Sequence, residues 1–158
     1  MIEPAQTETD EVVRDDANEL LNAAVSYGKR MLRKYGEFGP FGFRLNEEGK
    51  AVMESIAQHH MPPDASLLHG LLRQQLLERA QRGKLPAAAM ASNVTMGQPS
   101  GEGYRDAIMV EIEHRKGYVI KAFVPYKITG GQFFGFFPRV VRFGAIRTQP
   151  SEAQLFTP

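Results

Sequence analysis

An aspartate and a tyrosine are the side chains whose predicted positions best suit proton-transfer chemistry. Asp106 follows Arg105 and opens the apolar face of a predicted strand, and Tyr126 lies opposite it in the return strand. A carboxylate buried beside a tyrosine can act as a general acid or base. The interpretation that we favour is a hydrogen bond between Tyr126 and Asp106 that closes this end of the sheet. Asp106, Tyr126 and Arg105 therefore form the candidate pocket.

The other polar residues do not match a metal or phosphate motif. The chain contains no cysteine and four histidines, His59, His60, His69 and His114. No two of these histidines have the spacing that places zinc ligands on one helix face. The glycine-rich segment 97–103 precedes a predicted strand, whereas phosphate-binding loops lead into a helix N-terminus. We therefore predict no metal site and no cofactor.

Residues 132–143, QFFGFFPRVVRF, combine phenylalanine with arginine. Exposed phenylalanines among arginines can stack on the bases of single-stranded nucleic acid. Consecutive side chains on a strand point to opposite faces, so not all of these rings can be exposed on one strand. Burial on both faces, by helices or by a second subunit, is the other interpretation. Nucleic-acid binding through Arg139 and Arg142 is the hypothesis that this segment raises.

The charges are segregated along the chain, although the net charge of its 158 residues is only +1. Residues 1–26 contain seven acidic residues and one arginine, whereas residues 114–147 contain seven basic residues and no acidic one. This distribution indicates either an anionic partner or two copies whose opposite ends complement each other. No signal peptide and no apolar run of membrane-spanning length is visible, so we expect a cytoplasmic protein without a membrane partner.

Residues 9–35 are predicted to form one long helix, capped by Thr9 or Asp10. Acidic residues occupy its first turns and basic residues its last, which complements the helix dipole. Apolar and small side chains recur along one face every three or four residues. Two antiparallel copies of that face would bring each acidic half against a basic half. Packing on the helix's own domain is a compatible alternative. The candidate interface comprises Leu20, Ala24, Tyr27 and Met31.

The rest of the chain shows strand patterns and one further helix. The helix is expected between Asp64, its N-cap, and Gly83. Strands are expected at residues 41–45, 50–56, 85–95, 106–114 and 118–126, and residues 132–137 and 140–146 look like one or two further strands. A three-residue loop at 115–117 would connect the strands 106–114 and 118–126 and set their register. Residues whose numbers sum to 232 then lie opposite each other. Glu111 then lies opposite Lys121, and we expect Glu111 and Glu113 to face solvent.

This order of elements predicts one α+β domain over residues 1–158. Residues 37–147 would hold an antiparallel sheet of about five or six strands and one helix, and residues 148–158 a loose tail. The order resembles the profilin-like architecture, especially the roadblock/longin group, which implies helices packed on the sheet and dimers that bind small GTPases. The segments 37–42 (EFGPFG), 106–108 (DAI), 113–114 (EH) and 125–126 (PY) look like those of small bacterial proteins of unknown function.

The sequence therefore favours a non-enzymatic binding or interaction domain that acts as a homodimer, with a protein partner possible. A small-ligand binder or an enzyme with a pocket at Asp106 and Tyr126 is the alternative. Nucleic-acid binding through the basic aromatic C-terminal strands is the third hypothesis. We rank the hypotheses in this order because the first helix is long and charge-segregated and because the sequence has no catalytic motif.

Overall fold

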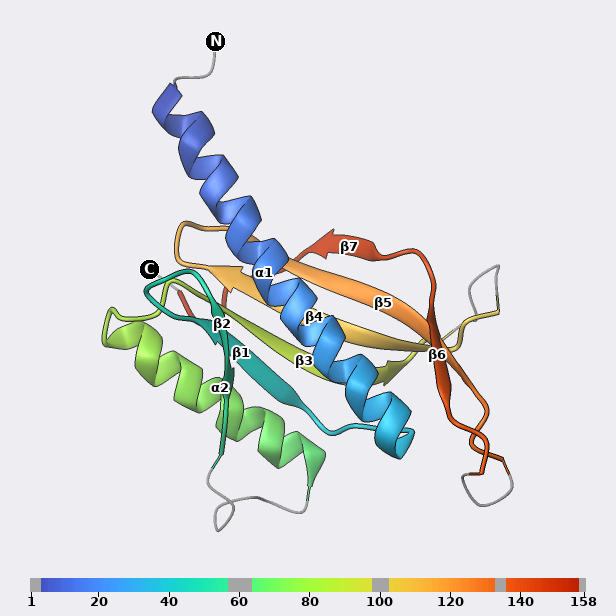
Figure 1. Ribbon diagram of the computed structural model, residues 1–158. Coiled ribbons are helices and arrows are strands. Elements are labelled where there is room, and N and C mark those ends of the chain that lie inside the picture. The colour runs from blue at the N-terminus through green and yellow to red at the C-terminus, as the bar shows by residue number, and fades with distance from the viewer. Residues whose placement is uncertain (1–3, 57–63, 98–102, 133–135, 157–158) are drawn as a thin grey trace.

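The computed structural model describes residues 4–56, 64–97, 103–132 and 136–156. These segments hold two helices and seven strands in the order α1 (Pro4–Tyr35), β1 (Phe41–Leu45), β2 (Ala51–Glu54), α2 (Ala65–Gln81), β3 (Ala87–Thr95), β4 (Asp106–His114), β5 (Val119–Thr129), β6 (Val140–Phe143) and β7 (Arg147–Pro150). The predicted α+β class, with helices packed on an antiparallel sheet, is confirmed (Figure 1).

The sheet is antiparallel throughout, in the order β2-β1-β3-β4-β5-β6, with β7 also paired to β5. β6 pairs with residues 126–129 of β5 and β7 with residues 120–123, so both short strands lie along β5. The register of β4 and β5 is the predicted one, with Asp106 opposite Tyr126 and Glu111 opposite Lys121. Gly117 has φ +95 in their loop, a conformation that glycine adopts without strain.

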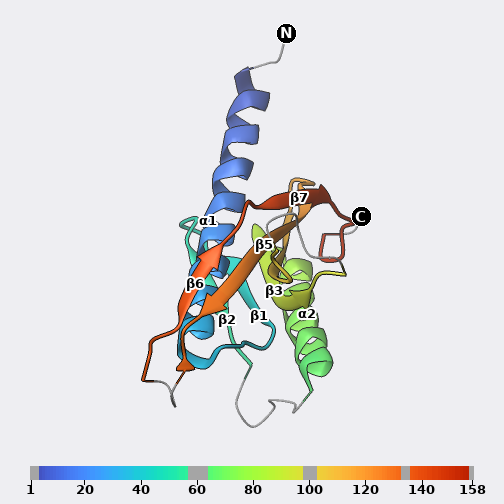
Figure 2. The same ribbon diagram turned by 90° about the vertical axis from the view of Figure 1, so that its right-hand side faces the viewer.

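The two helices cover opposite faces of the sheet, as Figure 2 shows. On the α1 face, the buried cluster includes Leu20, Ala24, Leu32, Ala89, Ile108, Val110, Ile112 and Val124. On the α2 face, it includes Leu72, Leu76, Ala80, Leu85, Ala88, Met90 and Leu155. β3 is buried on both faces along residues 87–91, which is why that stretch is small and apolar.

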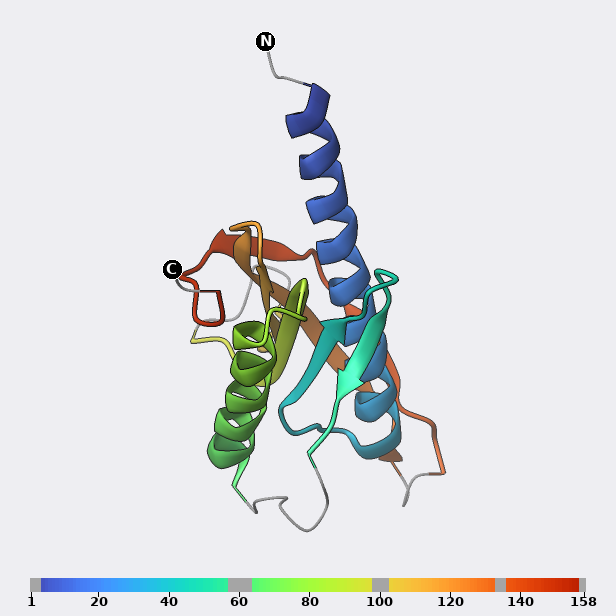
Figure 3. The same cartoon turned by 90° about the vertical axis from the view of Figure 1, so that its left-hand side faces the viewer.

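Only part of α1 lies on the sheet. Its N-terminal half extends beyond the sheet (Figures 1 and 3), and Ala17 is the first buried residue among its described side chains. Farther along, Gly28 lets the helix approach β4, because a Cβ at this position would lie 2.8 Å from Cδ1 of Ile108. The small residues of the α1 stripe thus serve packing within the domain.

The helix ends are partly as predicted. α1 begins at Pro4, so Thr9 and Asp10 lie inside the helix and the predicted cap at these residues is wrong; the polar residues before them continue the helix. Gly36 ends it as expected, with φ +77 and its N–H donating to the Leu32 carbonyl at 2.9 Å. The side chain of Asp64 accepts the N–H groups of Ser66 and Leu67, which confirms the predicted N-cap of α2.

Two predictions for the C-terminal region are wrong. The described residues of the expected strand 132–137 lie outside any strand, because Gly130 and Gly131, both at positive φ, turn the chain at the end of β5. Residues 148–150 of the expected loose tail belong to β7, and three later N–H groups bind Glu113. This strand has four exposed residues and thus no alternation of burial that a sequence pattern could reveal.

Candidate functional site

The predicted corner of Asp106 and Tyr126 is a packed end of the sheet. Tyr126 is buried, and its hydroxyl donates to Oδ1 of Asn93 at 2.6 Å rather than to Asp106. Burial raises the pKa of Tyr126, and the charge of Asp106 raises it further. Asp106 itself accepts a hydrogen bond from Thr95 at 3.3 Å, and Arg105 is exposed.

A hollow of about 330 Å³ lies on the other side of Asn93. Its lining includes Phe38, Pro40, Ser66, His69, Ser92 and Asn93. It is large enough for a small molecule. Its walls are the start of α2 and the end of β3, whereas the expected pocket lay at Asp106, Tyr126 and Arg105. Asn93 is the one described link, since it lines the hollow and accepts the Tyr126 hydroxyl.

The candidate interface on α1 faces the protein's own core. Leu20 and Ala24 are 0% and 1% exposed, and Met31 is half-buried. The Tyr27 ring packs edge-on against Phe41, with ring centroids 4.6 Å apart. The predicted contact with a second copy is therefore wrong for Leu20 and Ala24. A stripe that packs on a sheet has the same spacing as one that packs on a second helix.

Three buried ionisable side chains hold elements of the fold together. Glu54 lies between Arg44 and Arg79, at 3.2 and 3.0 Å, and also accepts from Gln75. Glu113 accepts the N–H groups of residues 154, 155 and 156 at 2.9–3.1 Å, so it is buried and the expectation that it faces solvent is wrong. His114 pairs with Asp16 of α1 at 2.8 Å.

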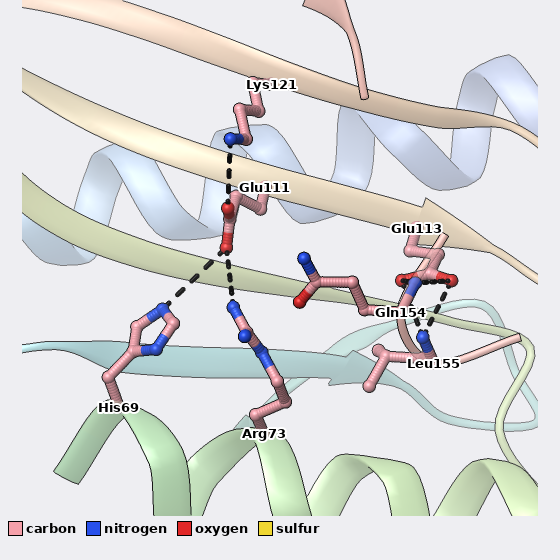
Figure 4. A network of polar contacts seen from close by, with 7 residues as sticks. All are labelled: His69, Arg73, Glu111, Glu113, Lys121, Gln154 and Leu155. Atoms are coloured by element: carbon pink, nitrogen blue, oxygen red, sulfur yellow. Dashed lines mark hydrogen bonds and ion pairs between the residues drawn. The ribbon is translucent and has the colours of Figure 1, made fainter. Parts of the chain in front are cut away.

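Glu111 is the centre of a looser network between α2 and the sheet (Figure 4). His69 and Arg73, one helical turn apart on α2, reach one carboxylate oxygen at 3.8 and 3.6 Å. Lys121 reaches the other oxygen at 3.7 Å. These separations exceed hydrogen-bond length, and the cavity of about 30 Å³ beside them has room for about one water molecule.

A cationic hollow lies between the last turns of α1 and the loop before β6. This basic groove has a volume of about 670 Å³. Its cationic lining consists of Lys29, Arg30, Arg33, Lys34 and Arg139, and Ser26, Gly131, Phe137 and Pro138 complete it. In the described segments, no carboxylate lies within ion-pair distance of these five side chains.

Arg139 connects the loop before β6 to the end of α1 and thereby forms part of this groove. Its guanidinium donates to the carbonyls of Lys34 and Arg33 at 3.0 and 3.5 Å, where a cation also complements the helix dipole. A Cβ at Gly36 or Gly131 would come within 3.2 Å of the Arg139 side chain. Both glycines therefore make the space in which Arg139 joins segments 105 residues apart.

The rim of the groove is aromatic. Phe136 and Phe137 are 84% and 48% exposed, and their rings meet edge-on. The expectation that helices bury the phenylalanine-rich segment on both faces is therefore wrong for these two residues, and burial by a second subunit stays a prediction. Residues 133–135, which include Phe133 and Phe134, lie outside the described residues.

In the described ranges, no group of three or more His, Asp or Glu side chains is placed to hold a metal ion. His59 and His60 are outside those ranges. Neither described helix combines the length and apolar character that a membrane span requires.

No protein-family model, curated protein or solved structure matches this chain. The resemblances to profilin-like domains and to small bacterial proteins remain predictions.

Sequence reasoning missed the groove because its two walls are distant in the chain. The sequence accounts for the basic residues of α1 as a complement to the helix dipole, and it places Arg139 between two predicted strands. The four-residue spacing of Lys29 with Arg33 and of Arg30 with Lys34 did signal a cationic helix surface. Nothing local indicated that residues 131–139 would lie beside it.

Proposed function

We propose that this chain is a cytoplasmic, non-enzymatic binding domain whose basic groove takes an acidic protein segment. The observation that carries the proposal is the convergence of five cationic side chains on one groove, with no described carboxylate to neutralise them. Clustered charge of one sign attracts the opposite sign and raises the association rate.

An acidic helix is the form of partner that the spacing favours. The cations on α1 recur one helical turn apart, about 5.4 Å, which is also the repeat of carboxylates on one face of an acidic helix. Phe137 and Pro138 give the groove an apolar wall. Exposed ion pairs contribute about 0.2–1 kcal/mol each, so we expect weak and salt-sensitive binding.

A second candidate function is the binding of single-stranded nucleic acid. The exposure of Phe136 favours it, because an exposed ring beside cationic side chains can stack on a base. Phosphates would then take the places that carboxylates take in the first proposal.

Fluorescence anisotropy with two labelled probes, polyglutamate and oligothymidylate, tests these functions. We expect polyglutamate to bind, and Lys29→Ala with Arg33→Ala to weaken its binding by about two- to thirtyfold, because two exposed ion pairs of about 0.2–1 kcal/mol each are lost. The control double variant is Arg82→Ala with Lys84→Ala, which removes the same charge from exposed residues outside the groove. Tighter binding of oligothymidylate at the groove would favour the second function. Absence of binding by both probes, or an equal loss in the control, would overturn the proposal.

A further inference from the structure

The surface of α1 that faces away from the sheet carries opposite charges at its two ends. Its exposed residues recur at spacings of three and four: Glu8, Glu11, Asp15, Asn18, Asn22, Ser26, Lys29 and Arg33. We name this row the outer stripe. It is acidic over its first three residues, uncharged over the next three and basic over the last two. If a second copy of α1 runs antiparallel to the first, the acidic end of each outer stripe therefore lies against the basic end of the other.

The acidic end has no described counterion. It lies on the half of α1 that extends beyond the sheet (Figures 1 and 3). Among the described residues, no basic side chain lies within ion-pair distance of Glu8, Glu11 or Asp15. A short polar helix without tertiary contacts is marginally stable in water, so this half of α1 needs a second surface to pack on.

From these relationships we infer that two copies of the chain pair through α1, antiparallel and across a two-fold axis. The inference rests on the proposed function, because the basic groove of each copy receives the acidic half of α1 from the other. Placing Glu8 opposite Arg33 sets the register. Because both helices rise by 1.5 Å per residue, all residues whose numbers sum to about 41 then face each other. Glu8 lies opposite Arg33, Glu11 opposite Arg30, and Asn18 near Asn22.

The apolar rim of the groove fits the same arrangement. Val12 is 48% exposed, and it is separated from Arg30 by five helical turns, so both lie on one flank of α1. Arg30 lines the groove together with Phe137. A two-fold axis between antiparallel helices keeps this flank on the same side in both copies. Val12 of each copy therefore approaches Phe137 of the other, and two exposed apolar side chains are buried together.

Charge reversal tests the pairing. The first variant carries Glu8→Lys, Glu11→Lys and Asp15→Lys, and the second carries Lys29→Glu, Arg30→Glu and Arg33→Glu. In sedimentation equilibrium we expect the unaltered protein to dimerise, with a dissociation constant that rises about tenfold between about 0.05 M and about 0.5 M salt. Each variant alone should be monomeric where the unaltered protein is dimeric. An equimolar mixture should form a heterodimer, since both sets of opposed charges are then opposite in sign.

Cysteine pairing tests the register, because the chain has no cysteine of its own. A double variant, Glu8→Cys with Arg33→Cys, should give a disulfide-linked dimer on oxidation. Moving the second cysteine to Ser26 should abolish that product. Circular dichroism of every variant checks that the fold is retained.

Two results would overturn the pairing: a monomeric protein at about 0.1 mM in low salt, where even weak self-association is populated, or a mixture of reversed variants that stays monomeric. Polyglutamate binding that survives either result leaves the proposed function intact and shows that the groove takes a different acidic partner. Loss of polyglutamate binding as well would remove the proposed function together with the pairing.

Discussion

His114 and Asp16 join the end of β4 to the point where α1 leaves the sheet, with Nε2 and Oδ2 only 2.8 Å apart. Nδ1 of the same imidazole accepts the N–H of Lys116 at 3.1 Å, so the ring proton lies on Nε2 and points to the carboxylate. Both side chains are largely buried, His114 at 4% and Asp16 at 18% exposure. The contact is a hydrogen bond between positions 98 residues apart.

The first prediction concerns this hydrogen bond. Asp16→Ala leaves a buried N–H without an acceptor and should lower the free energy of unfolding by about 1–3 kcal/mol. Asp16→Asn retains an acceptor oxygen, so its effect should be less than half as large. Urea denaturation near neutral pH measures both. Equal losses would mean that the carboxylate charge, and not the hydrogen bond, stabilises this contact.

The second prediction concerns the attachment of the C-terminal segment to Glu113. Glu113→Ala removes an acceptor shared by three backbone N–H groups, and we expect a loss of about 2–3 kcal/mol. Leu155, buried beside α2, should then detach. Hydrogen exchange provides the local readout: the amides of residues 154–156 should be protected in the unaltered protein and exchange rapidly in the variant. Unchanged protection would contradict the assigned role of Glu113.

The third prediction concerns the close approach of α1 to β4 at Gly28. Alanine gains about 1 kcal/mol of helix propensity over glycine, but overpacking costs about 1–3 kcal/mol. Gly28→Ala should therefore destabilise the protein, because its Cβ would lie 2.8 Å from Cδ1 of Ile108.

A double-mutant cycle separates these two effects. Ile108→Val removes the clashing methyl group, so Gly28→Ala in that background should be neutral or stabilising. The coupling between the two substitutions should be about 1 kcal/mol or more in favour of the double variant. Additive effects would show that the approach at Gly28 relaxes elsewhere.

Local interactions in this fold were predictable from the sequence, and long-range ones were not. The register of β4 and β5 follows from one three-residue loop and from facing apolar residues, such as Ile112 and Ile120. The cap of α2 by Asp64 lies within one helical turn. By contrast, alternation placed Glu113 on an exposed face, and residues more than 40 positions away bury it.

In the candidate site, too, local features were predictable from the sequence and long-range contacts were not. The apolar spacing of Leu20 and Ala24 indicated a packing surface but not whether a sheet or a second helix covers it. The pairing of Asp106 with Tyr126 was predicted, yet the hydroxyl binds Asn93 on a third strand, β3. The basic groove depends on Arg139 reaching the carbonyls that end α1, a contact that no periodicity encodes.

The fourth prediction is a pH dependence that originates at His69. Burial lowers the pKa of this imidazole, the charge of Arg73 lowers it further, and the charge of Glu111 opposes both. Lys121 lies 3.7 Å from the other carboxylate oxygen of Glu111. Because the folded protein binds this proton less tightly than the unfolded chain, stability is lost as the pH falls below about 6.5. His69→Gln should remove this part of the acid destabilisation and flatten the stability profile between about pH 7 and pH 5.

The neighbours of His69 give the sharper test, because they move its titration in opposite directions. By NMR, its midpoint should lie below the ordinary value of about 6.5. Arg73→Gln removes a cation and should raise the midpoint, whereas Glu111→Gln removes the one opposing charge and should lower it. Lys121→Gln should have a smaller effect, since Lys121 contacts the far oxygen of Glu111. His69 and Arg73 lie 3.8 and 3.6 Å from the same oxygen of Glu111. A midpoint that does not respond to Arg73→Gln or Glu111→Gln would mean that water separates these side chains in solution and screens their charges.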